Sequence, residues 1–415
     1  MPDDTHPIRR VLAIRDVRNL VAARFFAGLG KSLLHVTIHW HLWKVTGSAG
    51  YLGLLGLIEF LPVIPVSLLA GAVADHRDRR KIVMAAQSLG FACALVLMLG
   101  SIRGEDELLL LLVTAFVLAI GSSFENPAAG ALLPSLVPRE LFPTATVVSA
   151  NVRNIATVSG PVAMGFIAEA GGIPAVYATA LALVGLSVAM LFFVRSPAIE
   201  GGGSPIAWAS VREGVAFVWR QKVILGSMTL DMFAVIFASV TALLPIFATD
   251  LLGVDEVGYG LLSASVQAGT LVMAVLLLAL PPIRRPGRAL LIAVFFFGLA
   301  TIGFGLTRSF PLAVIALAIS GMADQVSMVS RSIILQLSTP DALRGRVNAV
   351  NMIFIGASNE LGAAESGFLA SLTSATFSVV FGGLTCLGVL AGMSLGVPSL
   401  RSYQIREQPP EAGPT

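Results

Sequence analysis

The chain has 415 residues, of which 56% are hydrophobic and only 12% are charged, and its mean hydropathy is +0.86. Because a soluble domain usually carries about a quarter charged residues, this composition excludes an ordinary soluble enzyme, a disordered chain and a nucleic-acid-binding protein. The net charge of +3 therefore indicates basic loops at a membrane surface rather than an acidic partner.

Twelve apolar stretches are long enough to cross a bilayer, which takes roughly 20 residues. They cover residues 19–44, 51–73, 82–102, 107–130, 145–168, 174–194, 225–250, 258–280, 288–307, 311–335, 346–371 and 376–397. The pattern predicts an all-α membrane protein with 12 transmembrane helices. Since twelve is even, both ends of the chain are expected on the same side of the membrane.

The basic residues indicate which side this is. The N-terminal segment and every second loop together hold twenty Lys and Arg residues, whereas the other loops hold only Lys44, Arg103 and Arg308. Lys and Arg gather in cytoplasmic loops, so both termini are expected to be cytoplasmic.

The longest polar interruption covers residues 195–223. Its first part is rich in Gly, Ser and Pro, and in its second part Trp208, Val211, Val215 and Val218 recur at helical spacing. We expect a flexible linker followed by an amphipathic helix at the cytoplasmic face, with a plain solvated connector as the alternative. The predicted organisation is a cytoplasmic tail at 1–18, a first bundle at 19–194, this linker, a second bundle at 224–397 and a cytoplasmic tail at 398–415.

The halves on either side of the linker resemble each other. Gly50, Tyr51 and Leu54 recur 208 positions later as Gly258, Tyr259 and Leu262, and the same offset pairs Glu59 with Gln267. A second set of four residues, Pro138, Leu141, Gly160 and Gly165, recurs 202 positions later as Pro340, Leu343, Gly362 and Gly367. Such ordered matches predict a duplicated six-helix unit with one substrate cavity between its copies.

The loop after the second span carries a spaced set of residues, Gly71, Asp75, Arg77, Arg79 and Arg80. The set resembles the G-x-x-x-D-[RK]-x-G-[RK]-[RK] signature of the major facilitator superfamily, with His76 and Asp78 as departures. The resemblance implies a cytoplasmic gate whose arginines pair with acids or lipid phosphates. A plain basic loop would explain the arginines but not the spacing of Gly71 and Asp75. The corresponding loop of the second half has Arg284 in place of the acid, so the gate is expected only in the first half.

Further stretches resemble the enterobactin-exporter branch of this superfamily over residues 20 to 395. They include 127–134, 136–141 and 160–165 in the first half, and 230–233, 242–245, 321–324, 336–341, 344–348 and 356–362 in the second. The resemblance implies the major facilitator fold, two pseudo-symmetric six-helix bundles in a bacterial inner membrane. It also implies a secondary transporter that exports a small organic molecule, with the proton gradient as energy source and no cofactor. The expected partners are that molecule and membrane lipids, with no nucleic acid, and we expect a monomer.

The fifth span contains Gly160, Pro161 and Gly165. Pro161 cannot donate a hydrogen bond to the carbonyl of Thr157, so a helix kink is expected there, and the glycines allow a neighbouring helix to approach. The motif partly resembles one associated with export in drug:proton antiporters. A structural kink without a directional role is the alternative.

Acids inside apolar spans are candidates for proton coupling, because burying a charge is costly unless it is paired or useful. The candidates are Glu59, Asp231, Asp324, Glu360 and Glu365, and a sixth acid, Glu125, lies in the fourth span. Glu59 and Asp231 are preferred because neither has a basic neighbour in sequence. Structural ion pairs are the alternative reading of these acids.

The expected cavity lining is Lys31, His35, His39 and Trp40 in the first span and Arg331 in the tenth. His35 and His39 have the spacing of a metal pair, but Val36 stands where a zinc protease needs Glu, so no metal is expected. The histidines and Trp40 are instead expected to face an anionic or aromatic cargo. Asp324 and Arg331 lie two turns apart on one helix face, so a substrate group or a side chain could bridge them.

The preferred function is a proton-driven exporter that works by alternating access, and not an enzyme. Uptake and lipid flipping by the same fold are the alternatives. An intramembrane enzyme would need a residue set that is missing, since the sequence has no G-x-x-x-x-G-K-[ST] loop, no H-E-x-x-H and no G-x-S-x-G.

Overall fold

The structure of the protein is a computed structural model that describes residues 7–104, 107–195 and 208–405; within these ranges the side chains of residues 7, 67–68, 71–72, 74–75 and 208–211 are not described. All regular secondary structure in the described ranges is helical. The prediction of an all-α protein is therefore confirmed for this part of the chain.

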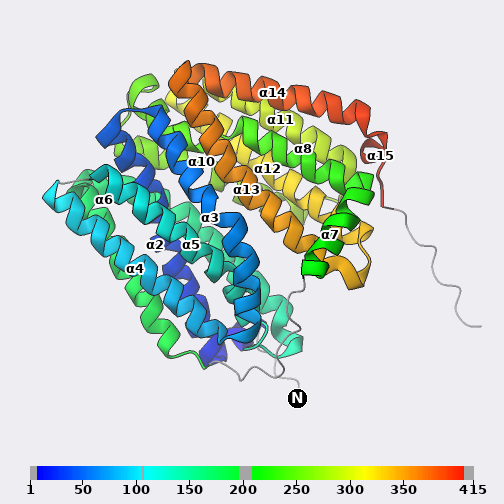
Figure 1. The fold of residues 1–415 in the computed structure, drawn as a ribbon, viewed down its shortest axis with the longest axis horizontal. Helices are drawn as coiled ribbons and strands as arrows, with labels where there is room; N and C mark the ends of the chain where they lie inside the picture. The colour runs from blue at the N-terminus through cyan, green and yellow to red at the C-terminus, as the bar shows by residue number, and fades with distance from the viewer. Residues whose placement is uncertain (1–6, 105–106, 196–207, 406–415) are drawn as a thin grey trace, which may run out of the picture.

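Six helices make up the first half (Figure 1). They are the short α1 (Pro7–Ala13), then α2 (Arg15–Thr46), α3 (Ala49–His76), α4 (Arg79–Arg103), α5 (Glu107–Leu132) and, after the 3-10 turn η1 (Arg139–Leu141), α6 (Phe142–Phe192). The segment 1–18, expected to be a tail, is helical from Pro7, and Val11 and Val17 are fully buried because α1 packs against α2 and α6.

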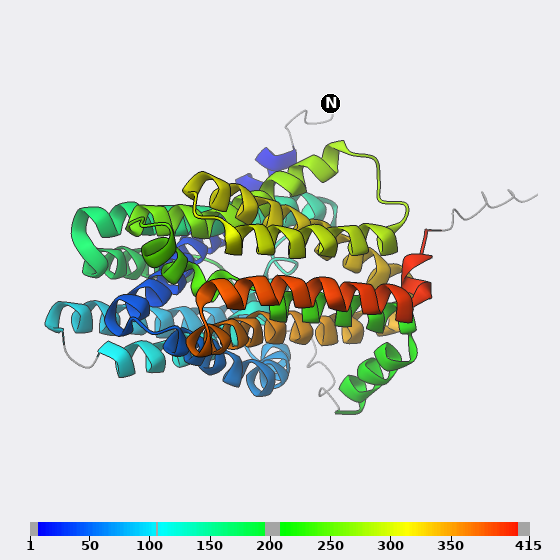
Figure 2. The ribbon, with the colours of Figure 1, turned by 90° about the horizontal axis from the view of Figure 1, so that it is seen from above.

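The second half begins with α7 (Trp208–Arg220), the amphipathic helix expected in the linker, while residues 196–207 lie outside the described residues. Then follow α8 (Lys222–Ala238), η2 (Thr241–Leu243), α9 (Leu244–Ile246), the π-helical turn η3 (Phe247–Leu251), α10 (Glu256–Ala279), α11 (Pro286–Leu306), α12 (Phe310–Ser338), η4 (Asp341–Leu343), α13 (Arg344–Leu372), α14 (Ala375–Gly396) and α15 (Pro398–Arg401). Figure 2 shows α7 and α15 at the same end of this half.

Within the described ranges, nine helical segments are long and apolar enough to cross a membrane, compared with the twelve predicted spans. Two of the predicted spans, 145–168 and 174–194, are merged in α6, where the backbone leaves the helical conformation at Gly172 with a φ of 72° that glycine adopts readily. The helices α2 and α13 are 32 and 29 residues long but are not among the nine, because polar side chains interrupt them.

Two seams of small residues join the halves. Along α3 and α13, a Cβ added to Gly53 would lie 2.8 Å from the backbone nitrogen of Phe368. Along α6 and α10, a Cβ added to Gly165 would lie 2.8 Å from the Cα of Val257. Glycine permits this close approach of backbones.

Both seams lie near the end of the molecule where α2 ends and α10 begins, which we call the closed end. At the other end α2, α4 and α13 begin, and we call it the basic end for its Arg-rich loops. The two halves diverge toward the basic end (Figure 1). This arrangement leaves room for a cavity between them.

Candidate functional site

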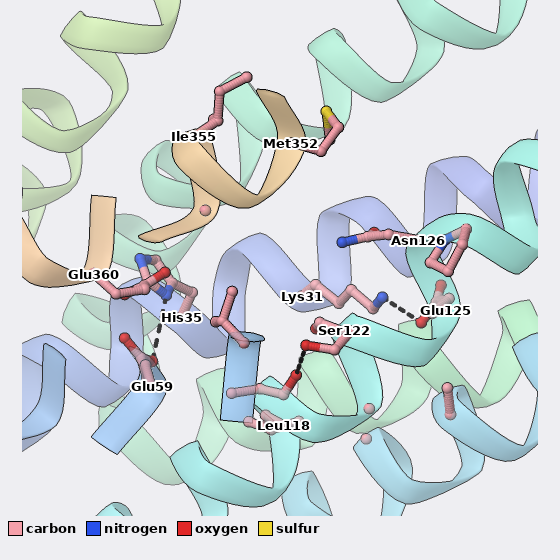
Figure 3. Close-up of a pocket in the computed structure, with 18 of the residues that line it drawn as sticks. Lys31, His35, Glu59, Leu118, Ser122, Glu125, Asn126, Met352, Ile355 and Glu360 are labelled. Carbon is pink, nitrogen blue, oxygen red and sulfur yellow. Dashed lines mark hydrogen bonds and ion pairs between the residues drawn. The ribbon is translucent and has the colours of Figure 1, made fainter. Parts of the chain in front are cut away.

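A cavity of about 920 Å³ lies between the halves. Its wall comes from α2, α3, α4, α5 and the second part of α6, and from the first half of α13, beginning at Gly345 and Arg346 (Figure 3). Most wall residues are apolar, and the volume falls in the range of about 300–1,000 Å³ typical of small-molecule sites. The cavity therefore suits an organic molecule, and it extends toward the basic end.

An ion pair between Lys31 of α2 and Glu125 of α5 lies on the wall (Figure 3). Gln87 Nε2 donates to Glu125 Oε1 at 3.1 Å, and Ser187 Oγ donates to Gln87 Oε1 at 2.8 Å. Glu125 is thus held by two partners, whereas the Lys31 side chain is 35% exposed. An ammonium group has three donors, so Lys31 can bind an additional acceptor in the cavity.

A second polar group joins the two halves across the wall. Nδ1 of His35 lies 3.9 Å from Oε1 of Glu59, and the carboxyl group of Glu360 approaches Glu59 from α13 (Figure 3). One oxygen of Glu59 is buried without a hydrogen-bond partner in the described part of the chain. Two carboxylates so close in an apolar wall cannot both be ionised without cost, so this group is suited to bind and release a proton.

The other preferred acid, Asp231, lies elsewhere. It forms an ion pair with Arg331, and Ser327 Oγ donates to its Oδ1 at 2.9 Å. Neither side chain of the pair lines the large cavity, and their exposed fractions are only 7% and 6%. Asp231 has no basic neighbour in sequence, but the fold brings it one from α12, as the alternative reading of a structural ion pair describes.

The remaining candidates do not line the large cavity. Asp324 is partly buried in α12, and Glu365 has a buried carboxyl oxygen with no hydrogen-bond partner among the described residues. Trp40 is fully buried and stacks on Tyr259, with ring centroids 4.7 Å apart. His39 lines a separate small pocket. Of the five residues expected to face cargo, Lys31 and His35 are on the wall.

Arg79 and Arg80 of the gate motif form hydrogen bonds to other helices of the first half. Arg79 donates to the carbonyl of Ala131 at 3.2 Å, and Arg80 donates to that of Phe192 at 2.9 Å. Both carbonyls lie at helix C-termini, where cations are favourable. Asp78, a departure from the signature, accepts from the backbone nitrogens at the start of α4 and caps that helix. Arg77 is exposed, and the side chains of Gly71 and Asp75 lie outside the described residues, although both positions are in α3.

Gly160, Pro161 and Gly165 lie in the first part of α6. Ser32 Oγ donates to the Thr157 carbonyl at 3.1 Å, which is the acceptor that Pro161 leaves free. The backbone stays helical at Pro161, however, and the break in α6 is at Gly172. Gly160 packs against Ser32 of α2 and Gly165 against α10, so these glycines act through close packing.

Direct contacts between the halves shut the closed end. Trp43 Nε1 donates to Thr249 Oγ1 at 2.9 Å, Lys44 Nζ lies 3.2 Å from Glu256 Oε1, and Tyr259 Oη donates to the Val36 carbonyl at 3.1 Å. These contacts come from α2 on one side and η3 and α10 on the other. The structure is therefore sealed at this end.

The sequence analysis did not assign Glu125 or Gln87 to the cavity. Structural ion pairs were the alternative reading of the buried acids, but no local spacing connects Glu125 with a lysine 94 positions away. Only the packing of α2 against α5 brings the two together.

Comparison with known proteins identifies the family. The chain matches the transmembrane secretion effector family over residues 11–412. The multidrug efflux pump Tap of Mycobacterium tuberculosis (strain ATCC 25618 / H37Rv) is 27% identical over 407 residues, which cover 94% of this chain and 95% of that protein. The enterobactin exporter EntS of Escherichia coli O81 (strain ED1a) is 26% identical over 411 residues, with 98% and 95% covered.

The fold has solved counterparts as well. The crystal structure of the nucleoside transporter NupG superimposes with a TM-score of 0.72 and 12% identity, covering 94% of this chain and 99% of that one. Together with its apolar helices, these matches identify the chain as a multi-pass membrane transporter that belongs to the transmembrane secretion effector family of the major facilitator superfamily.

Proposed function

We propose that this transporter exports a small amphipathic organic molecule in exchange for protons. The observation that carries the proposal is the group of Glu59, Glu360 and His35 on the wall of a mostly apolar cavity that is sealed at one end. The efflux function named for Tap and the export function named for EntS support export as the direction.

The proposed topology has twelve spans in two pseudo-symmetric six-helix bundles, with both termini in the cytoplasm of a bacterial inner membrane. In this reading α6 supplies two spans, and α2 and α13 also cross the membrane. Their lower hydropathy has a physical reason, because both present ionisable side chains to the cavity rather than to lipid. The basic end is then cytoplasmic, and the conformation described here is open toward the cytoplasm.

In the proposed cycle, cargo and proton compete for the same carboxyl groups. Cargo enters from the cytoplasm and displaces a proton from the Glu59–Glu360 pair, the halves rock, and the closed end opens. A proton from outside then binds the carboxyl pair and favours release of the cargo. Lys31, held by Glu125, orients acceptor groups of the cargo.

One chain encloses the whole proposed pathway, which supports a monomer. The proton gradient supplies the energy, so the cycle needs no cofactor. In the opposite conformation the gate motif holds the cytoplasmic side shut.

The test is internal pH in sealed proteoliposomes during addition of enterobactin, ethidium or rhodamine 6G. Wild type is compared with Glu59→Gln and Glu360→Gln, and Glu140→Gln, an exposed glutamate in η1, serves as the matched control. We expect a compound-dependent proton flux in wild type and control that falls at least about tenfold in the two cavity variants. Movement of a compound without any proton flux would indicate a facilitator, and concentrative movement in the opposite direction would indicate uptake.

A further inference from the structure

A second pocket, of about 110 Å³, lies between α2, α6, η2 and α10. Most of its surface is carbon, but eight of its ten lining residues carry a polar side-chain group, among them Ser32, His35, His39, Thr241, Ser263 and Gln267. A pocket of this size has room for ordered water. It is too small for the organic cargo of the large cavity.

Two polar groups in this pocket can take a water partner. The buried Oγ of Ser263 faces the Tyr259 hydroxyl, whose own hydrogen goes to the Val36 carbonyl, and it forms no hydrogen bond to another described residue. His39 is 3% exposed, and its Nδ1 lies 3.0 Å from the backbone carbonyl of His35. Since a carbonyl only accepts, Nδ1 carries the hydrogen and Nε2 of His39 is left as an acceptor that no described residue fills. Buried polar groups of this kind are usually satisfied by ordered water.

His35 is the one residue that lines both pockets. Its Nδ1 faces Glu59 at 3.9 Å, and its ring lies 4.6 Å from the ring of His39. Imidazole takes up a proton on one nitrogen while it releases another from the second nitrogen. The side chain is therefore placed to connect water in the small pocket with the carboxyl group in the large cavity.

We propose that the small pocket is a water-filled proton chamber and that His35 passes protons between its water and the Glu59–Glu360 pair. A hydronium ion in the chamber protonates Nε2 of His35, the Nδ1–H bond breaks, and the proton moves to a carboxylate oxygen of Glu59. One water or a small rotation of the ring spans the 3.9 Å gap, and a ring flip restores the tautomer. The proposal rests on the proton coupling put forward above.

The surroundings of His35 favour this direction of transfer. Acids face it from α3 (Glu59) and α13 (Glu360), while its own helix contributes Lys31 and His39. On the side of the small pocket, α6, η2 and α10 contribute only uncharged residues. The chamber lies toward the closed end, so protons reach the carboxyl pair from the side opposite the mouth used by cargo.

The test uses proteoliposomes with enterobactin, ethidium and rhodamine 6G as probes and measures two quantities. The first is compound-driven proton flux, and the second is counterflow, the exchange of labelled for unlabelled compound, which needs no net proton transfer. His35→Gln removes the relay group, and Ser263→Val makes the chamber less polar. His41→Gln is the matched control, because His41 lies on the same helix and lines neither pocket.

We expect proton flux to fall at least about tenfold in His35→Gln and Ser263→Val, with counterflow within about twofold of wild type and the control unchanged in both measurements. Wild-type proton flux in His35→Gln would overturn the relay and leave the proposed function standing. Equal loss of flux and counterflow would make His35 a cargo ligand and would also overturn the relay. Absence of proton flux in wild type with every probe would overturn both proposals.

Discussion

Two ion pairs between helices of the described residues, one from each half, can be compared. In the first half Lys31 of α2 pairs with Glu125 of α5, and in the second half Asp231 of α8 pairs with Arg331 of α12. Asp231 follows Lys31 by 200 positions and Arg331 follows Glu125 by 206. In the predicted repeat α8 corresponds to α2 and α12 to α5, so the two pairs join corresponding helices with the charges exchanged.

The surroundings of the pairs differ. Lys31 is one-third exposed on the wall of the large cavity, whereas Asp231 and Arg331 are sealed among packed helices with Ser327 as a further partner. A pair of opposite charges between two helices therefore has different surroundings in the two halves. Access to the cavity, rather than the presence of a charge inside the membrane, separates a pair that can meet cargo from one that holds helices together.

The largest effect is expected from breaking the sealed pair. Arg331→Leu leaves Asp231 as an uncompensated buried charge, which should lower the free energy of unfolding by about 3–5 kcal/mol. Replacing both residues by leucine removes the two charges together and should recover most of that loss. Thermal unfolding in detergent measures both variants. A single variant as stable as wild type would mean that the pair is not desolvated.

Exchanging the charges of the cavity pair is the next test. Because the second half uses the opposite polarity between the equivalent helices, Lys31→Glu combined with Glu125→Lys should fold with a stability within about 1 kcal/mol of wild type. Transport should nevertheless fall at least about tenfold, since cargo then meets an acid where it met an ammonium group. Unfolding and compound flux are measured on the same preparation, and retained transport would remove Lys31 from the cargo site.

A smaller difference is expected between two helix starts near the basic end. The side chain of Asp78 caps α4, whereas α11 starts at Arg285 and Pro286 without a side-chain cap. Asp78→Ala should therefore lower the free energy of unfolding by about 1 kcal/mol. Arg285→Ala should change it by less than about 0.5 kcal/mol. Chemical unfolding of both variants in detergent measures the difference, and equal losses would contradict the capping role.

The helices were largely predictable because most spans can be recognised from their own stretch of sequence. Apolar length and the turn residues between stretches place α4, α5, α10, α11, α12 and α14 near their predicted ranges. The helices that fall short in hydropathy, α2 and α13, both line the cavity and carry ionisable side chains there, although α3, α4, α5 and α6 line it as well. The buried helical turn around Val11 was missed because its charged neighbours resemble an ordinary tail.

The site was only partly predictable, because partners come from distant parts of the chain. Glu59 and Glu360 were identified as candidates from their burial in apolar spans, but nothing in the sequence places them together. Asp231 looked equivalent to Glu59 until the packing of α8 against α12 supplied Arg331. Glu125 was passed over because its lysine lies on a helix three elements earlier. An ionisable residue in a span can therefore be found from sequence, but its partner requires the fold.

The smallest effect concerns two partly exposed ion pairs that connect different parts of the molecule. Lys44–Glu256 joins the two halves at the closed end, whereas Glu213–Arg346 joins α7 to α13 within the second half. Exposed pairs contribute about 0.2–1 kcal/mol, so neither Lys44→Ala nor Glu213→Ala should unfold the protein. Only the first pair must break when the closed end opens, so Lys44→Ala should raise the population of the opened conformation by about twofold. Spin labels on α2 and α10 report that population as a distance distribution, and Glu213→Ala should leave it unchanged. An equal shift in both variants would mean that an ion pair affects this population in the same way whether it joins the two halves or lies within one half.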